Sequence, residues 1–213
     1  MRQKKYLIAY TAARPYRGTL GTEVNKWQRT KEAQAFIKKA QGTETKYKLR
    51  VRDAGGGMGK GLYTLKGISQ KGLKVGLYAG ELTNNETVKN VQGDYLIDFP
   101  YFEKYKGVLL DAEQLMKTRV DHWNVAHANH SCEKYNCILI QVKVGNGTFL
   151  VLQTLRKIKP GEQLLFDYDE GSVGHPYWEK EEYAGQAKEL YGDRAMLCVC
   201  DKPCPLRRYR VKD

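Results

Sequence analysis

The chain has 213 residues, of which 41% are hydrophobic, enough for one substantial core and a small appendage. No run of about twenty apolar residues occurs, and the stretch Tyr6–Tyr10 is too short for the core of a signal peptide, so we expect an intracellular protein without a membrane span. The 36 Lys and Arg residues outnumber the 24 Asp and Glu residues, and the resulting formal charge of +12 would attract nucleic acid or another polyanion.

The first segment, residues 1–46, is expected to contain one amphipathic helix. Thr30 can cap its start, and Gly42 is where we expect it to end, because glycine is frequent just past the last turn of a helix. Four apolar residues between them recur at helical spacing: Ala33, Phe36, Ile37 and Ala40.

From Tyr47 onwards the pattern changes to short strand-like runs separated by Gly, Asn and Pro. The triplet Gly145, Asn146 and Gly147 predicts a tight hairpin turn between two of these runs. The expected strands are residues 47–52, 74–78, 94–99, 137–144, 149–155 and 163–168. We therefore expect a mostly β domain of the α+β class over residues 47–170, with several small sheets and few short helices.

The last segment, residues 171–213, begins with a pattern that predicts a helix, which Pro176 can start and Gly192 can end. Three cysteines and a basic tail follow it. The three are Cys198, Cys200 and Cys204. With five cysteines in total, an odd number, this cluster suits a metal site in a reducing compartment better than a disulfide framework.

The glycine-rich segment Gly55–Gly61 invites two phosphate-binding interpretations, and neither fits. A P-loop needs glycine five positions before the Gly-Lys pair and Ser or Thr after it, but these places hold Ala54 and Gly61. A dinucleotide fingerprint lacks its last glycine here, and the segment leads into the strand-like run 62–64 rather than a helix. This argues against a nucleotide hydrolase and against the Rossmann class of methyltransferase.

Six segments carry motifs in a fixed order. They are Gly59–Tyr63, Tyr78–Glu81, Asp94–Asp98, Leu110–Ala112, Asn129–Cys132 and Gly161–Tyr168. Their order and flanking residues resemble the SET-domain protein lysine methyltransferases over roughly residues 47–206. The resemblance implies the SET fold with a threaded C-terminal segment, and transfer of methyl groups from S-adenosylmethionine to a lysine side-chain amine.

The resemblance also implies a set of residues that bind the cofactor. The glycine loop would touch S-adenosylmethionine through Met58, Gly59 and Lys60, and missing side chains there let a ligand lie against the backbone. Asn129 can offer both amide donor and acceptor, while His130 is expected to act largely through its backbone. The remaining implied contacts are Tyr95, and Leu206 on the adenosine.

Tyrosines suit the chemistry of lysine methylation, which needs a neutral amine, an aligned methyl group and exclusion of water. A Tyr hydroxyl can hydrogen-bond the amine without a carboxylate that would keep the lysine protonated. Tyr168 ends the Phe-Asp-Tyr motif and is the first candidate for a catalytic residue, with Tyr95 as the second and Tyr78 as a wall of the lysine channel. A purely structural role competes with this interpretation for any single tyrosine, because the chain has 15 of them and β domains often bury tyrosine.

Phe166 bears on the product of the reaction. In the family that the chain resembles, a tyrosine two residues before the catalytic tyrosine restricts the site to one methyl group, whereas phenylalanine leaves room for more. The resemblance therefore implies that dimethyl- or trimethyl-lysine can form.

The three C-terminal cysteines resemble the family's post-SET motif, in which they bind one structural zinc together with the cysteine of the Asn-His-Ser-Cys segment, here Cys132. Three departures from the family pattern concern loop geometry. Only three residues separate Cys200 from Cys204, His127 and Ala128 stand where the family often has Arg-Phe-Ile, and one residue is added after Cys132. Three reduced cysteines without metal are the competing interpretation.

A histone is the expected substrate, which would place the protein at chromatin in the nucleus. A basic histone tail would be repelled by a uniformly positive enzyme. Either Glu81, Asp94 and Asp98 make the cleft locally acidic, or the positive surface binds nucleic acid that accompanies the substrate. Two alternatives stay open: a non-catalytic SET-like module that binds chromatin or nucleic acid, and a methyltransferase for a nonhistone target such as a ribosomal protein.

Overall fold

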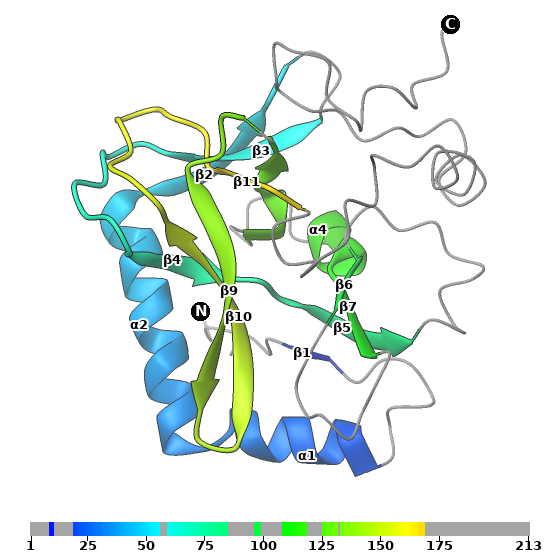
Figure 1. Ribbon diagram of the computed structural model, residues 1–213. Helices are drawn as coiled ribbons and strands as arrows, with labels where there is room; N and C mark the ends of the chain where they lie inside the picture. The colour runs from blue at the N-terminus through cyan, green and yellow to red at the C-terminus, as the bar shows by residue number, and fades with distance from the viewer. Residues whose placement is uncertain are drawn as a thin grey trace, which may run out of the picture. The chain divides into compact units, whose positions relative to one another are not determined.

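The computed structural model describes residues 9–10, 19–55, 59–84, 96–98, 108–118, 125–131 and 133–168. Strands in several small sheets predominate over helices, as the sequence predicts (Figure 1). The chain divides into two compact units, of which the first comprises residues 1–46, 74–126 and 140–152 and the second residues 47–73, 127–139 and 153–213. Within the described ranges, none of the helices has the length and hydropathy of a membrane span.

The predicted N-terminal helix is α2, Lys31–Tyr47. Its start is as expected, because the Thr30 hydroxyl accepts a hydrogen bond from the Ala33 N–H at 3.3 Å. Its end differs from the prediction, since the helix passes through Gly42. The buried face that Ala40 belongs to continues beyond the glycine to Glu44, and packing of this face outweighs the cost of about 1 kcal/mol for a glycine inside a helix. A second helix, α1 at Thr19–Gln28, was not predicted.

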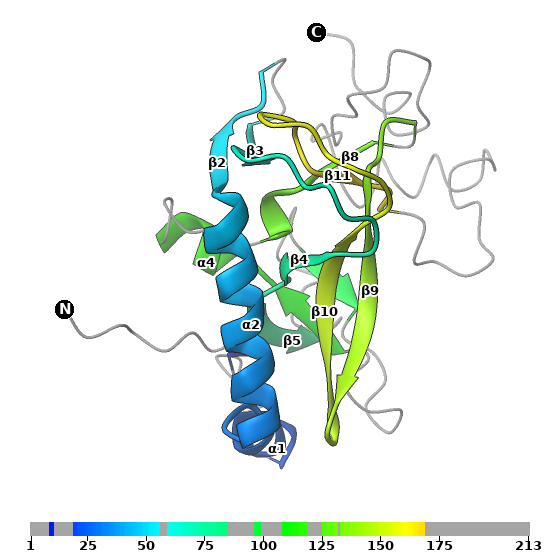
Figure 2. The ribbon, with the colours of Figure 1, turned by 90° about the vertical axis from the view of Figure 1, so that its left-hand side faces the viewer.

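Aromatic packing within the first unit joins these helices to the turn half of a long hairpin. The hairpin consists of β9, Cys137–Val144, and β10, Gly147–Thr154, and its turn at Gly145 is the predicted one. The Phe149 ring is fully buried, 4.5 Å from the Trp27 ring and 5.0 Å from the Phe36 ring between centroids. Trp27 Nε1 donates to the Val144 carbonyl at 2.7 Å, and both views show the turn end of the hairpin beside α1 (Figures 1 and 2).

The first unit also holds a four-stranded sheet with the order β1-β5-β7-β6. Its strands are β1 at Ala9–Tyr10, β5 at Gly80–Asn84, β7 at Val108–Asp111 and β6 at Leu96–Asp98. The short helix α4, Glu113–Thr118, follows β7, and Asp111 Oδ1 caps it by accepting the Glu113 N–H at 2.8 Å. The strand β4, Lys74–Leu77, neighbours β10.

The second unit brings together segments that lie far apart in the sequence. The strand β8, Asn129–His130, and the strand β11, Leu165–Phe166, pair in parallel and lie side by side (Figure 2). On its other side β11 pairs with the first residue of β9, Cys137. The predicted strand 163–168 is thus a two-residue strand with a neighbour on each side. The backbone before it bonds elsewhere, because the Leu164 N–H donates to the Leu62 carbonyl at 2.7 Å and the Gln163 carbonyl bonds to a side chain.

That side chain belongs to Asn136, which is 1% exposed. Its Oδ1 accepts the Leu165 N–H at 2.9 Å, and its Nδ2 donates to the Gln163 carbonyl at 2.8 Å and to Glu162 Oε1 at 3.1 Å. The Asn136 N–H also donates to the Leu165 carbonyl at 3.1 Å. Because the amide oxygen and the amide nitrogen both have partners, Asn136 fixes the position of β11 without leaving either of them unpaired.

The glycine loop joins β2, Leu49–Asp53, to β3, Lys60–Thr64, an antiparallel pair in the second unit. Two of its glycines serve different purposes. Gly59 has a φ of 67°, in the left-handed region that favours glycine. Gly61 allows close packing, because a Cβ there would lie 2.3 Å from Gln163 Nε2.

Glu44 of α2 is a buried carboxyl group in the first unit. It is 2% exposed, and neither of its oxygens has a hydrogen-bond partner among the residues that the structure describes. A Cβ at Gly76 would lie only 3.0 Å from Glu44 Oε1, so the glycine makes room for this side chain. Burial raises the pKa of Glu44 from the ordinary value of 4.5 to about 11, so the carboxyl is protonated at neutral pH.

We predict that Glu44→Met stabilises the protein at pH 7 by at least about 1 kcal/mol, because it removes a buried polar group without a partner. Above a pH of about 4.5 the unfolded state loses the Glu44 proton and the folded state keeps it, so the wild-type stability falls as the pH rises from there towards 11. Urea unfolding should therefore show a larger gain for the variant at pH 8 than at pH 5. An equal gain at both pH values would contradict this, and Glu44→Gln controls for loss of ionisation alone.

We predict that Gly59→Ala destabilises the protein by about 1–2 kcal/mol, because alanine disfavours a positive φ. No described atom lies within 4 Å of the Cβ position, so backbone strain and not a clash is the cause. Gly59→Asn is the matched control and should cost less, because asparagine adopts the left-handed region more readily. Equal unfolding free energies for the two variants would show that the φ of Gly59 is unimportant.

Candidate active site

Tyr168 follows β11 and contacts the segment around β8. In the parallel pair Leu165 lies opposite Asn129 and Phe166 opposite His130. The Tyr168 side chain is only partly exposed, and its hydroxyl donates to the Ala128 carbonyl at 3.0 Å. Strand pairing therefore brings the two most distinctive motifs of the sequence into direct contact.

The His130 side chain holds the backbone of Tyr168. Its Nδ1 accepts the Tyr168 N–H at 3.2 Å, and the two rings meet edge to face with centroids 5.1 Å apart. Asp167 Oδ1 lies 3.6 Å from the same nitrogen. The two would form an ion pair only if Nδ1 carried a proton, and a nitrogen that accepts a hydrogen bond from the Tyr168 N–H carries none. Burial lowers the pKa of His130 and Asp167 opposes this, so we assign the neutral ring. The sequence had not suggested a role for this side chain.

Phe166 forms a wall beside Tyr168. It is 6% exposed, and its ring centroid lies 4.6 Å from that of Tyr168 at an interplanar angle of 43°. The tyrosine ring is thus in contact with one aromatic side chain from its own segment and with the imidazole from β8. These contacts restrict the rotation of the Tyr168 side chain.

His127 and Asn129 lie on either side of Ala128 in the sequence, and each carries buried polar atoms. His127 is 3% exposed, and neither of its ring nitrogens, nor Asn129 Nδ2, has a hydrogen-bond partner within the described part of the chain. Burial, and to a smaller degree the charge of Lys60, lower the pKa of His127 to about 4, so its ring is neutral at pH 7. Buried polar atoms normally have partners, so these three fit a site that a polar ligand completes.

The other predicted site residues are distributed as follows. Gly59 and Lys60 belong to the same unit as Tyr168 and are exposed at the start of β3. Tyr78 belongs to the first unit, where it is 4% exposed and its N–H donates to the Leu150 carbonyl at 2.9 Å. Seven lie outside the described residues: Met58, Tyr95, Cys132, Cys198, Cys200, Cys204 and Leu206. The predicted C-terminal helix over residues 176–192 lies outside them as well.

Metal binding has no support from the described residues, among which no group of His, Cys, Asp or Glu side chains could hold an ion. Cys137 is described, and it is fully buried with a free thiol. Burial raises the pKa of this thiol far above its ordinary value. Cys137 is therefore an ordinary core residue.

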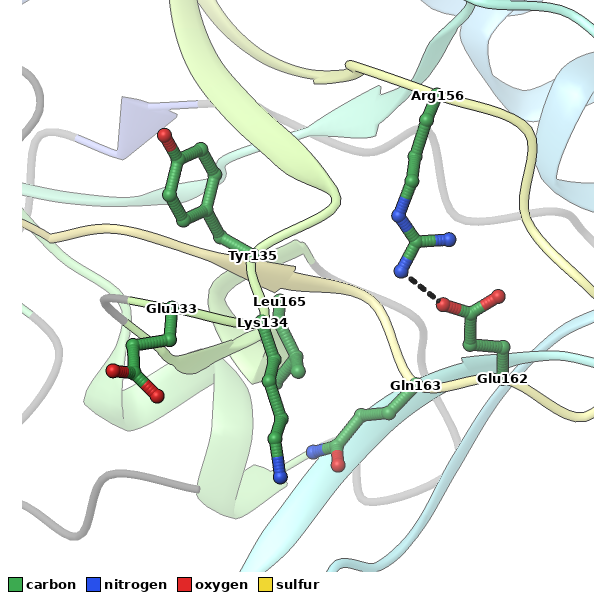
Figure 3. Close-up of a pocket in the computed structure, with 7 residues that line it drawn as sticks. All are labelled: Glu133, Lys134, Tyr135, Arg156, Glu162, Gln163 and Leu165. Atoms are coloured by element: carbon green, nitrogen blue, oxygen red, sulfur yellow. Dashed lines mark hydrogen bonds and ion pairs between the residues drawn. The ribbon is translucent and has the colours of Figure 1, made fainter. Parts of the chain in front are cut away.

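A separate cavity of about 390 Å³ lies in the second unit (Figure 3). Its lining residues are Glu133, Lys134, Tyr135, Arg156, Glu162, Gln163 and Leu165. None of the predicted site residues is among them. The Arg156 guanidinium donates to Glu162 Oε1 at 2.5 Å, and Asn136 and the Lys159 N–H also bond the Glu162 carboxylate, so this acidic group supports the loop before β11.

Comparison with protein families matches residues 59–169 to the SET domain. No curated protein matches the chain. The matched segment is just over half of the 213 residues and contains Gly59, Lys60, Asn129, His130, Phe166 and Tyr168. The chain therefore belongs to the SET-domain family.

Proposed function

We propose that this protein transfers methyl groups from S-adenosylmethionine to the side-chain amine of a lysine in a protein substrate. SET domains are generally protein lysine methyltransferases, and such enzymes use S-adenosylmethionine. The observation that carries the proposal for this chain is the fixed hydroxyl group of Tyr168 beside the Asn129–His130 strand.

The direction of the Tyr168 hydrogen bond supports a catalytic role. Because the hydroxyl proton goes to the Ala128 carbonyl, the phenol oxygen offers lone pairs as an acceptor. Such an oxygen attracts a positively polarised methyl group and the ammonium product, yet carries no full negative charge that would hold the lysine protonated. Tyr168 is therefore the proposed catalytic residue.

The neighbours of Tyr168 supply the positioning that methyl transfer needs. S-adenosylmethionine, when bound, supplies a methyl group on a sulfonium sulfur that is open to attack by an amine. His130 holds the Tyr168 backbone and Phe166 holds its ring, so the hydroxyl oxygen keeps one position. Apolar Phe166 also excludes water from this side of the ring, which favours the neutral amine.

We propose cofactor binding for some residues that the structure describes and for some that lie outside the described ranges. The unpartnered polar atoms of His127 and Asn129 fit a polar ligand, and exposed Gly59 and Lys60 belong to the same unit. Contacts from Met58, Tyr95 and Leu206 rest on the sequence motifs alone. Two further proposals also rest on the sequence motifs alone. They are the role of Tyr78 as a wall of the lysine channel, and a zinc ion held by Cys132, Cys198, Cys200 and Cys204.

The substrate is proposed to be a histone, with a nonhistone protein such as a ribosomal protein as the alternative. Glu81 is one candidate for local negative charge, although burial and the Asp111 carboxylate opposite it raise its pKa. The formal charge of +12 supports the other option, in which a positive surface binds nucleic acid that accompanies the substrate. The product would then form at chromatin or on a ribonucleoprotein.

Incubation with labelled S-adenosylmethionine and separate pools of nucleosomes, free histones and ribosomal proteins tests the function. We expect the wild type to label lysine in at least one pool.

Tyr168→Phe removes only the hydroxyl and should lower the rate by about 10²-fold. Its melting temperature and cofactor affinity should stay close to those of the wild type. Undiminished labelling by the variant would remove Tyr168 from the mechanism. Cofactor binding without labelling of any pool would favour a non-catalytic binding module.

Phe166→Tyr should shift the product towards monomethyl-lysine, because an added hydroxyl beside Tyr168 occupies space and holds water where further methyl groups would lie. Mass spectrometry would compare an unmodified and a monomethylated peptide of the labelled substrate. The wild type should modify both, and the variant only the first. A wild-type enzyme that yields only monomethyl-lysine would refute the role of Phe166.

A further inference from the structure

The segment from His127 to Asn129 buries three polar atoms without partners in the described part of the chain. His127 ends the short 3-10 helix Val125–His127, and both of its ring nitrogens are buried. Asn129 Nδ2, two residues later, is buried as well. Such atoms weaken the folded state unless something supplies hydrogen bonds to them, so a concentration of them in one segment points to a ligand.

Lys60 adds a positive charge to this group. After burial, the charge of its ammonium is the second cause that lowers the pKa of the His127 imidazole, and both residues belong to the same unit. A neutral imidazole has one N–H donor, the Asn129 amide nitrogen has two, and the lysine ammonium has three. Together these side chains are rich in donors and carry a net positive charge, and an anion with several acceptor oxygens complements them.

We propose that His127 binds the carboxylate of the amino-acid moiety of S-adenosylmethionine, together with Asn129 and Lys60. This rests on the proposed function and deepens it, because the carboxylate is the only anionic group of that cofactor. His127 is then a residue that orients the cofactor, although the sequence marks it only as a departure from the family pattern.

Two ligands that differ in the amino-acid moiety test the proposal by calorimetry. S-adenosylhomocysteine has the carboxylate, and 5′-methylthioadenosine lacks the whole moiety. His127→Phe keeps a ring of similar size without polar atoms, and it should lower the affinity for S-adenosylhomocysteine about tenfold while leaving that for 5′-methylthioadenosine unchanged. His127→Gln keeps a donor and should restore most of the loss.

The ligand-free His127→Phe variant should melt no lower than the wild type, because it removes buried polar atoms that have no partner. The matched control is Glu44→Met in the first unit, which also removes a buried unpartnered polar group and should change neither affinity. Equal losses for both ligands, or no loss in His127→Phe, would overturn the role of His127 alone. A wild-type protein that does not bind S-adenosylhomocysteine would overturn the proposed function as well.

Discussion

The parallel pairing of β8 with β11 is the interaction on which the candidate site depends. Each strand has two residues, so the pairing alone is weak, and its register is held from both sides. The Ser131 N–H donates to the Phe166 carbonyl at 3.2 Å, and Asn136 binds the backbone of Leu165 through two separate atoms. A shift of one residue would turn Phe166 and Tyr168 towards the opposite face.

Two kinds of buried polar group occur among the residues that the structure describes. Asn136 has partners for its oxygen and its nitrogen, and it holds a backbone segment in place, which is a structural role. His127 and Asn129 Nδ2 have none among the described residues and lie next to the site, whereas Glu44 has none and lies in the other unit. The same energetic deficit can thus mark a ligand site or a position that simply reduces stability, and only His127 and Asn129 belong to the segment that carries the catalytic motif.

Local signals predicted those parts of the fold that local interactions determine. The Thr30 cap, the turn at Gly145 and the strand 137–144 all follow from residues within one turn or one strand. The end of α2 does not follow from local residues, because burial of its later residues outweighs the tendency of Gly42 to end the helix. The motifs identified Tyr168 and Phe166 as candidates, but the contact from His130 Nδ1 to Tyr168 spans 38 positions, and no periodicity reveals it.

The acceptor for the Tyr168 hydroxyl is a main-chain carbonyl, and every amino acid supplies one. Position 128 can therefore change its side chain without losing the interaction, provided that the backbone keeps its course. Ala128 is fully buried, so only a small residue fits there, but any such residue would supply the same acceptor. Insertions or deletions near Ala128 would have the opposite effect, since they move the oxygen itself. For this contact, the length of the segment before Asn129 therefore matters more than the residue type at position 128.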